Sequence, residues 1–330
     1  MKNIITILAV WLCCIGATAQ VRSQMTAFPG GKYQIYRVAL QDKRGCKASL
    51  KHPEKFLSEK SLRRRAKQHL LVDSTDLPLS RTYLKKMAEQ GFAIIGGSKW
   101  NNTVLVKDTC ASAPQRLCAL PFVTSVVKVF GGVDSVKLTP PSTVRPDTLI
   151  ARYKAKTRYG QGEHQISMLN GQKLHEAGFN GKGILVAVID GGFMNVDKIG
   201  YLKNVNIVGT RDFVYPYTAN LYDERDHGTE VLSTIAANSD SVFVGTAPGA
   251  SFLLLRSEFG PWENLVEEDF WTQAVEYADS VGADIVTSSL GYTEFDDKAA
   301  SHKYREQDGR TALISRTASM ISGKGMILTN

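Results

Sequence analysis

Two patterns of apolar and polar positions divide the 330-residue chain. In the first half, apolar and polar residues alternate over residues 32–40, which is typical of a strand with one buried face. Similar segments recur between amphipathic helical stretches. The order predicts a small ferredoxin-like α+β domain built on a split βαβ unit. The predicted elements are strand 32–40, helices 56–69 and 79–90, strands 92–100 and 103–107, helix 112–120 and strand 123–130.

In the second half, the predicted strands are continuous apolar runs. Residues 184–190 read Ile-Leu-Val-Ala-Val-Ile-Asp, as expected for a strand of a parallel sheet that is buried on both faces. Such runs alternate with helical segments, which predicts an α/β fold with a doubly wound, mostly parallel sheet. The predicted strands are 184–190, 205–213, 251–257, 283–290 and 326–330, and the predicted helices are 166–177, one that begins near His227, 265–281 and 311–322.

Two segments fit neither pattern. Residues 1–19 combine a basic start, an apolar run and a small-residue cleavage signal, which predicts a secretory signal peptide. We therefore expect a secreted, periplasmic or cell-surface protein, and no other stretch is apolar and long enough to span a membrane. Residues 138–162, rich in proline, glycine and basic residues, indicate a linker between domains 20–137 and 163–330. The last predicted strand has no closing helix, so we expect the second domain to be only the N-terminal portion of a larger one.

Charge is distributed unevenly along the chain. Residues 1–160 hold 27 Lys and Arg against 9 Asp and Glu, a net charge of +18, whereas residues 161–330 have a net charge of −10. A basic half can indicate nucleic-acid binding, but it can also dock on an acidic domain of the same chain. We expect no nucleic-acid partner, and we interpret Arg63-Arg64-Arg65 as a solvated helix face.

Three cysteines follow the predicted signal peptide: Cys46, Cys110 and Cys118. An odd number in an exported protein allows one disulfide and one free thiol, and the sequence does not decide which pair forms. The second half has no cysteine and must fold without disulfides.

Candidate chemistry begins at Asp190, which ends a predicted buried strand and is followed by two glycines. It should therefore lie at the carboxyl edge of the sheet, where open α/β sheets place their sites. His227 opens a predicted helix, and Gly228 leaves the approach to the imidazole clear. A buried carboxylate can fix the tautomer of an imidazole and stabilise its charged form, so that the ring acts as a general base near neutral pH.

A third candidate segment is Ser289-Leu290-Gly291, at the end of the strand predicted over residues 283–290. A strand edge with a glycine can pair with an extended peptide through its backbone. The alternative is that this segment is only the end of a core strand.

In this order, Asp190-Gly191-Gly192, His227-Gly228-Thr229 and Ser289-Leu290-Gly291 resemble the motifs of the subtilisin-like serine proteases. The resemblance covers about residues 165–330. It implies that Asp190 orients His227, that His227 is the base of an Asp-His-Ser triad, and that Ser289, Leu290 and Gly291 bind the substrate backbone. It implies no required cofactor. Calcium is common in the family, and its ligands are not identified in this sequence.

Residues 55–64 and 98–101 are similar to the N-terminal region of secreted subtilases of the Bacteroidetes type. This resemblance implies a propeptide that assists folding and acts as an intramolecular inhibitor. The opposite charges of the two halves agree with such docking.

The sequence departs from the family pattern in three places. The family's serine belongs to a Gly-Thr-Ser motif that these 330 residues lack, Glu230 stands where a second histidine is usual, and the oxyanion asparagine should follow shortly after Asn330. We predict a serine endopeptidase acting on peptides or proteins, with its serine beyond residue 330, and expect this chain alone to be inactive. One alternative is a non-enzymatic peptide-binding pseudoprotease. A metal hydrolase using Asp190 and His227, with Asp226 or Glu230, is a weaker alternative.

Overall fold

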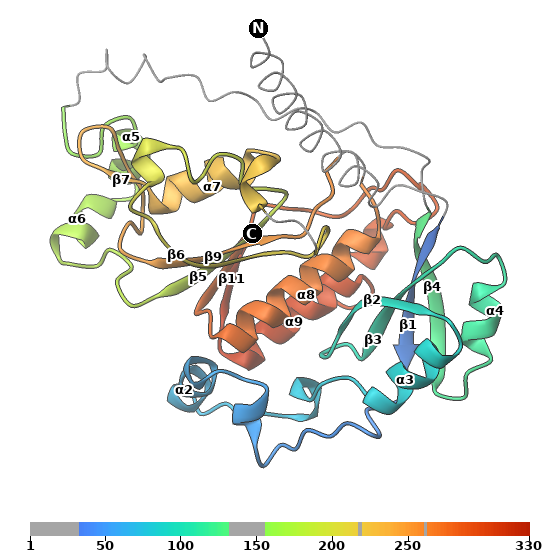
Figure 1. Ribbon diagram of the computed structural model, residues 1–330. Coiled ribbons are helices and arrows are strands. Elements are labelled where there is room, and N and C mark those ends of the chain that lie inside the picture. Colours follow the sequence, from blue (N-terminus) through green and yellow to red (C-terminus); the bar gives the residue numbers. More distant parts are fainter. Residues whose placement is uncertain (1–32, 132–155, 217–219, 261–262) are drawn as a thin grey trace, which may run out of the picture.

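The computed structural model describes residues 33–131, 156–216, 220–260 and 263–330. Two sheets of different kinds lie on either side of a pair of helices, α8 and α9 (Val266–Val281 and Leu313–Ile321) (Figure 1). One sheet is antiparallel with the strand order β2-β3-β1-β4, and the other is parallel with the order β11-β10-β5-β9-β6. The predicted signal peptide, residues 1–19, and most of the predicted linker, residues 138–155, lie outside the described residues.

The N-terminal domain contains the predicted ferredoxin-like order of elements. Its helices are shorter than predicted; helix α2 begins only at Glu59, because the side chain of Ser58 accepts a hydrogen bond from Ser61 N and caps it. Asn101 and Asn102 lie in the turn that joins β2 to β3, and Asn102 adopts a left-handed φ of 53°. The elements are β1 (Gln34–Leu40), α2 (Glu59–Lys67), α3 (Arg81–Glu89), β2 (Ala93–Ser98), β3 (Thr103–Asp108), α4 (Ala113–Cys118) and β4 (Val123–Gly131).

Alternation along β1 gives the antiparallel sheet two buried faces. Tyr36 and Val38 point into the domain's own core with α3 and α4. Ile35 points to the opposite face, where it joins a cluster that includes Phe270 of α8. The period of two that identified this strand therefore also divides its side chains between the two domains.

The second domain has the predicted alternation of strands and helices. The helix predicted over 166–177 is instead two short helices, because Asn170 adopts a left-handed φ of 55° between them. A small hairpin, β7–β8, was not predicted. The elements are α5 (Glu163–Met168), α6 (Gly171–Glu176), β5 (Leu185–Asp190), β6 (Asn206–Asp212), α7 (His227–Ala236), β7 (Asn238–Ser239), β8 (Phe243–Val244), β9 (Ser251–Arg256), α8, β10 (Ile285–Ser288), α9 and β11 (Ile327–Thr329).

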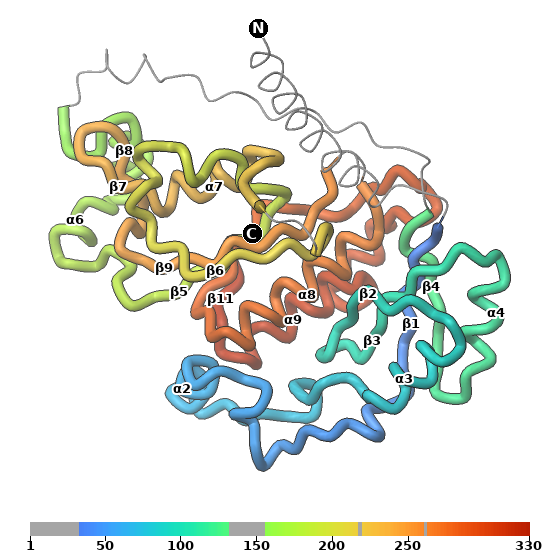
Figure 2. Tube along the Cα trace, viewed as in Figure 1, coloured from blue at the N-terminus to red at the C-terminus, as the bar shows by residue number. Residues whose placement is uncertain are grey.

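Strand β5 lies at the centre of the parallel sheet and is buried throughout. Ala187 and Ile189 pack toward α8 and α9, whereas Val186 and Val188 pack on the other face, in the cluster that includes residues of α7. Both faces are covered by helices, as the path of the chain in Figure 2 shows, which explains why this strand reads as a continuous apolar run.

The interpretation of Arg63-Arg64-Arg65 as a solvated face is wrong for two of its three members. Arg63 is exposed, and among the described residues it pairs only with Glu59, at 3.1 Å. Arg64 and Arg65 are buried, with 7% and 1% of their surface exposed. They contact the second domain, so three consecutive arginines have two different roles.

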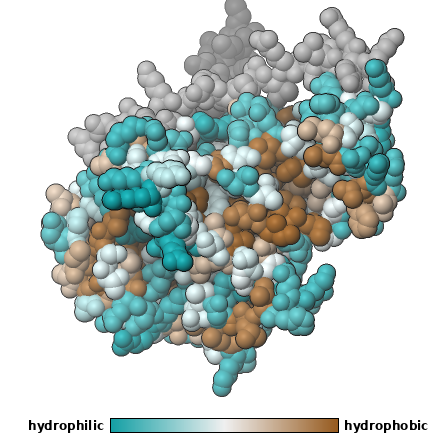
Figure 3. Space-filling model, turned by 180° about the vertical axis from the view of Figure 1, so that it is seen from behind, coloured by the Kyte–Doolittle hydropathy of each residue, from teal (hydrophilic) through white to brown (hydrophobic). Residues whose placement is uncertain are grey.

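Three further observations concern the surface, membrane-spanning helices and the cysteines. Apolar patches bordered by hydrophilic side chains lie across the face seen in Figure 3. No helix among the described residues is long and apolar enough to cross a membrane. Cys46, Cys110 and Cys118 are all free thiols, so the disulfide that the sequence allowed is not formed.

Candidate active site

Asp190 ends β5, the central strand, and its side chain is fully buried at the carboxyl edge of the sheet. The carboxylate accepts a hydrogen bond of 2.7 Å from the backbone N–H of Gly191. Burial raises the pKa of Asp190, and the hydrogen bonds from His227 and Gly191 oppose this effect. A buried carboxylate in this position requires a polar partner.

His227 is that partner. Its Nδ1 lies 2.8 Å from Oδ1 and 3.0 Å from Oδ2 of Asp190. The hydrogen bond to the carboxylate raises the pKa of His227, although burial of the ring acts in the opposite direction. About half of the imidazole side chain, 51%, is exposed. Within the described part of the chain, Nε2 has no hydrogen-bond partner, so the ring is held on one side and open on the other.

Two glycines permit this approach. A Cβ on Gly228 would lie 2.8 Å from Cβ of Asp190 and 2.9 Å from the ring of Phe193. A Cβ on Gly192 would lie 2.8 Å from Cβ of Arg225, in the segment that leads to the helix. Any larger residue at either position would push the first turn of α7 away from the end of β5.

Ser289, Leu290 and Gly291 follow β10 at the same edge of the sheet. Strand β10 pairs in parallel with β5, and its last residue, Ser288, is opposite Ile189. Ser289 and Gly291 are exposed, and Leu290 is partly buried. Ser288 is buried and its hydroxyl accepts a hydrogen bond of 2.8 Å from Trp271 Nε1, which makes it part of the core.

Asn330 lies at the end of β11, beside this segment. With its amide group oriented so that Nδ2 faces the protein, Asn330 donates hydrogen bonds to the carbonyl oxygens of Ser288 and, at 2.9 Å, Leu290. The amide therefore bridges two neighbouring strand ends.

Thr229, in the first turn of α7, is buried, and its hydroxyl donates a hydrogen bond of 2.8 Å to Met194 O.

Sequence reasoning missed Glu258, which lies just beyond the end of β9. Ser257 N donates to Asp190 O at 3.0 Å, so this segment runs directly beside Asp190. Burial, followed by the charge of Glu263, raises the pKa of Glu258 to about 7. The rule that drew attention to Asp190, a polar residue after a buried strand, would also have identified Glu258. Arg225 lies near both carboxylates and favours their charged forms.

A pocket and possible metal-binding clusters were also considered as functional sites. A pocket of about 370 Å³, lined by residues such as Tyr159 and His175, includes neither Asp190 nor His227. Among the described residues, no group of three or more His, Cys, Asp or Glu side chains is arranged to hold a metal ion. The geometry gives no support to the metal-hydrolase alternative, which needs further ligands beside Asp190 and His227.

Solved structures with the same fold include two proteases. The epidermin leader peptide processing serine protease of Staphylococcus aureus has a TM-score of 0.51 at 12% identity, with 90% of this chain and 59% of that chain covered. Fervidolysin of Fervidobacterium pennivorans, a keratinolytic enzyme related to subtilisin, has a TM-score of 0.50 at 16% identity, with 90% of this chain and 39% of that chain covered. The fold is therefore subtilisin-like, with an additional N-terminal α+β domain.

Sequence comparison identifies the family. Residues 181–323 match the subtilase family, and residues 35–143 match the peptidase S8 propeptide domain of Bacteroidota. Subtilisin E of Bacillus subtilis is 30% identical over 153 residues, which are 45% of this chain and 36% of that protein. The alkaline protease of Alkalihalobacillus alcalophilus is 30% identical over 161 residues, which are 48% of this chain and 39% of that protein.

The chain belongs to the subtilase family of serine proteases and carries an N-terminal propeptide domain. It spans less than two fifths of the length of the two curated relatives described above.

Proposed function

We propose that the whole protein is a secreted serine endopeptidase in which Asp190 and His227 are two members of an Asp-His-Ser triad. One observation carries this proposal: the buried carboxylate of Asp190 holds Nδ1 of His227 at 2.8 Å, while about half of the imidazole remains exposed. This arrangement fixes the tautomer that leaves Nε2 free to take a proton from a serine hydroxyl.

The remaining parts of the mechanism follow from the sheet edge. A substrate chain would pair with the exposed backbone of Ser289 to Gly291 and present its carbonyl carbon near His227. The serine would attack that carbon, and His227 would carry the proton to the leaving amine. We propose that this serine is supplied from beyond residue 330 and that the 330-residue chain alone is inactive. The proposed chemistry requires no cofactor.

The propeptide domain completes the proposal. Residues 20–137 would act as an intramolecular inhibitor, and residues 1–19 would direct export. Arg37 of β1 donates to Asp269 of α8 at 2.6 to 3.0 Å, which joins the basic half of the chain to the acidic half as the charge distribution suggested.

The test compares two proteins: this chain and the gene product extended to an in-frame Gly-Thr-Ser segment. The extended protein should hydrolyse a denatured protein substrate, and His227→Ala should reduce kcat by about 10⁴-fold or more. The control is His164→Ala, because His164 is exposed on α5.

Three results would contradict parts of the proposal. Full activity of the extended His227→Ala variant would overturn the role of His227. Hydrolysis by the 330-residue chain that is lost in His227→Ala would overturn the placement of the serine. Peptide binding without hydrolysis by the extended protein would favour the pseudoprotease alternative.

A further inference from the structure

The C-terminal end of α8 is capped by the propeptide domain. The last carbonyl groups of a helix have no partner within the helix and need donors from elsewhere. Here Ser58 N donates to Ser280 O at 2.9 Å, and Ser58 Oγ donates to Val281 O at 2.8 Å. Gly282 follows with a φ of 102°, and a Cβ there would lie 2.7 Å from Cβ of Lys60, so this helix end is shaped to receive α2.

Arg64 extends the cap to the beginnings of two strands. Its guanidinium donates to Ala283 O, just before β10, and at 3.2 Å to Lys324 O, shortly before β11. The same group pairs with the carboxylate of Asp279 on α8. One propeptide side chain therefore connects a helix end and two loops of the second domain.

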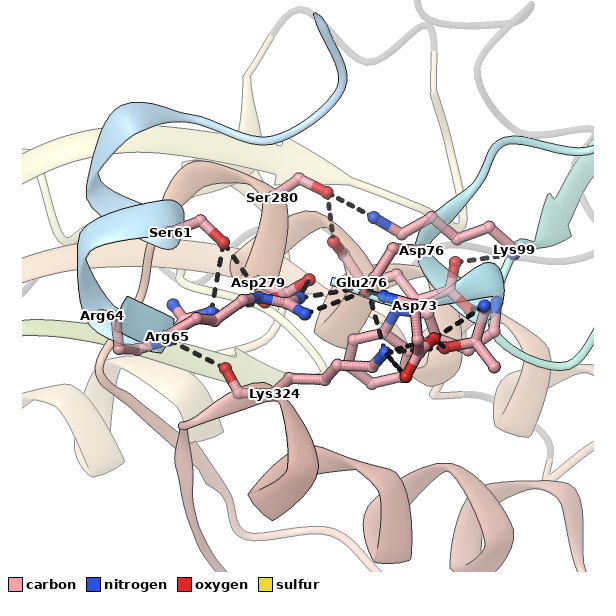
Figure 4. A network of polar contacts seen from close by, with 12 residues as sticks. Ser61, Arg64, Arg65, Asp73, Asp76, Lys99, Glu276, Asp279, Ser280 and Lys324 are labelled. Atoms are coloured by element: carbon pink, nitrogen blue, oxygen red, sulfur yellow. Dashed lines mark hydrogen bonds and ion pairs between the residues drawn. The ribbon is translucent and has the colours of Figure 1, made fainter. Parts of the chain in front are cut away.

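Arg65 forms the centre of the contact, as Figure 4 shows. It donates to Asp76 of its own domain at 3.0 and 3.1 Å and to Asp279 at 2.7 and 2.9 Å. The side chains of Arg65, Asp76 and Asp279 have 1% or less of their surface exposed. These charges are removed from water only while the two domains are together.

Lys324 makes the reciprocal contact from the second domain. Its ammonium group lies 3.2 Å from Asp73, 2.6 Å from Thr75 Oγ1 and 3.1 Å from Asp76. Each domain thus contributes both a cation and an anion to the buried cluster. We call the propeptide side of this contact the arginine clamp, and it consists of Ser58, Arg64, Arg65, Gln68, Asp73, Thr75 and Asp76.

The clamp is distinct from the rest of the interface. The antiparallel sheet packs on the first turns of α8, where Arg37 meets Asp269, and the β2–β3 turn docks on Glu276 through backbone N–H groups of Lys99 and Trp100 at 2.8 and 3.0 Å. The clamp holds the opposite end of the same helix, beyond the antiparallel sheet (Figure 1). The domain is therefore attached at both ends of α8.

We propose that the arginine clamp is the attachment that keeps the propeptide domain bound to the second domain after the connection between them has been cut. Removing one partner of a buried, hydrogen-bonded charge pair mainly increases the dissociation rate, because the remaining charge stays buried and unpaired. Salt screens buried pairs weakly, so the attachment should persist at high ionic strength. This inference does not depend on peptidase activity.

The test uses the full chain with a site for a sequence-specific protease inserted within residues 138–162. The folded protein is cut, held on a surface through a C-terminal tag, and the departure of the N-terminal domain is followed over time. Arg65→Ala should increase the dissociation rate about a hundredfold. Arg63→Ala is the matched control and should leave the rate within about twofold, because Arg63 is exposed and forms an ion pair with Glu59 of its own helix.

Two results would overturn the proposal: equal rates for Arg65→Ala and Arg63→Ala, or rapid release by Arg37→Ala with slow release by Arg65→Ala. If Arg65→Ala does not fold, Gln68→Ala provides the measurement. It removes the hydrogen bond of 2.7 Å from Gln68 Nε2 to Gly325 O and should speed release several-fold. An unchanged rate in that variant would count against the clamp.

Discussion

Asp190 and Asp279 are both buried carboxylates at the ends of secondary-structure elements, but their partners differ. Asp279 is enclosed by two guanidinium groups, Arg64 and Arg65, which are themselves buried. Asp190 pairs with one imidazole that remains about half exposed. A carboxylate whose partners are all internal can only hold parts of the molecule together. A carboxylate whose partner is exposed to solvent can instead raise the basicity of that partner, which is then able to react with a bound molecule.

The largest expected difference between the two is kinetic. In the extended, active protein, Asp190→Asn should lower kcat by about 10⁴-fold, because an amide neither fixes the tautomer of His227 nor stabilises its charged form. Asp190 raises the pKa of His227, so the variant's residual activity should rise at a lower pH than that of the wild type. A full pH–rate profile measures both effects. An unshifted profile with unchanged kcat would mean that Asp190 does not control the imidazole.

Asp279→Ala should instead affect stability. It leaves Arg64 and Arg65 buried without their shared carboxylate, and the expected loss in the free energy of unfolding is about 3–5 kcal/mol. Urea unfolding of the intact chain provides the measurement. The control is Asp240→Ala, because Asp240 is 70% exposed and its pair with Arg158 should contribute at most about 1 kcal/mol. Similar losses in the two variants would remove the distinction between enclosed and open carboxylates.

The smallest expected effect concerns Glu258, which lies at the open edge beside Asp190. Its pKa in the folded chain is raised to about 7 from an ordinary value of 4.5, chiefly by burial. The folded state therefore holds this proton more tightly than the unfolded state. The resulting stability is fully present below about pH 4.5 and is lost as the pH rises through about 7.

Glu258→Gln should remove this part of the pH dependence, which urea unfolding between pH 4.5 and 8 would detect. Glu294→Gln serves as the control, because Glu294 is exposed on a loop. If the difference in stability between wild type and Glu258→Gln is constant across this range, Glu258 does not titrate as described.

Sequence reasoning identified the elements that carry strong local signals. The run 184–190 was predicted to be a buried strand because it is continuously apolar up to Asp190, and the structure places β5 there, at the centre of the parallel sheet. His227 was recognised as a helix start, and the structure brings it within 2.8 Å of Asp190. Both residues could be predicted because each lies at the end of a secondary-structure element that the local sequence pattern identifies.

Other features depend on contacts between distant segments. Nothing in the triplet Arg63-Arg64-Arg65 tells which side chains face solvent, because the burial of Arg64 and Arg65 is decided by Asp279, more than 200 residues later. The break between α5 and α6 depends on one left-handed residue, Asn170, within an otherwise helical pattern. Glu258 was missed because the same strand-end argument was not applied to β9.

The reciprocal charges around Lys324 have a consequence for domain exchange. A propeptide domain from a relative would need carboxylates at the positions of Asp73 and Asp76 as well as the two arginines, because Lys324 and Asp279 have opposite signs. A merely basic substitute would satisfy Asp279 and repel Lys324. Compatibility between a propeptide and its protease is thus specified at individual residues, and chimaeras should fail unless both signs are transferred together.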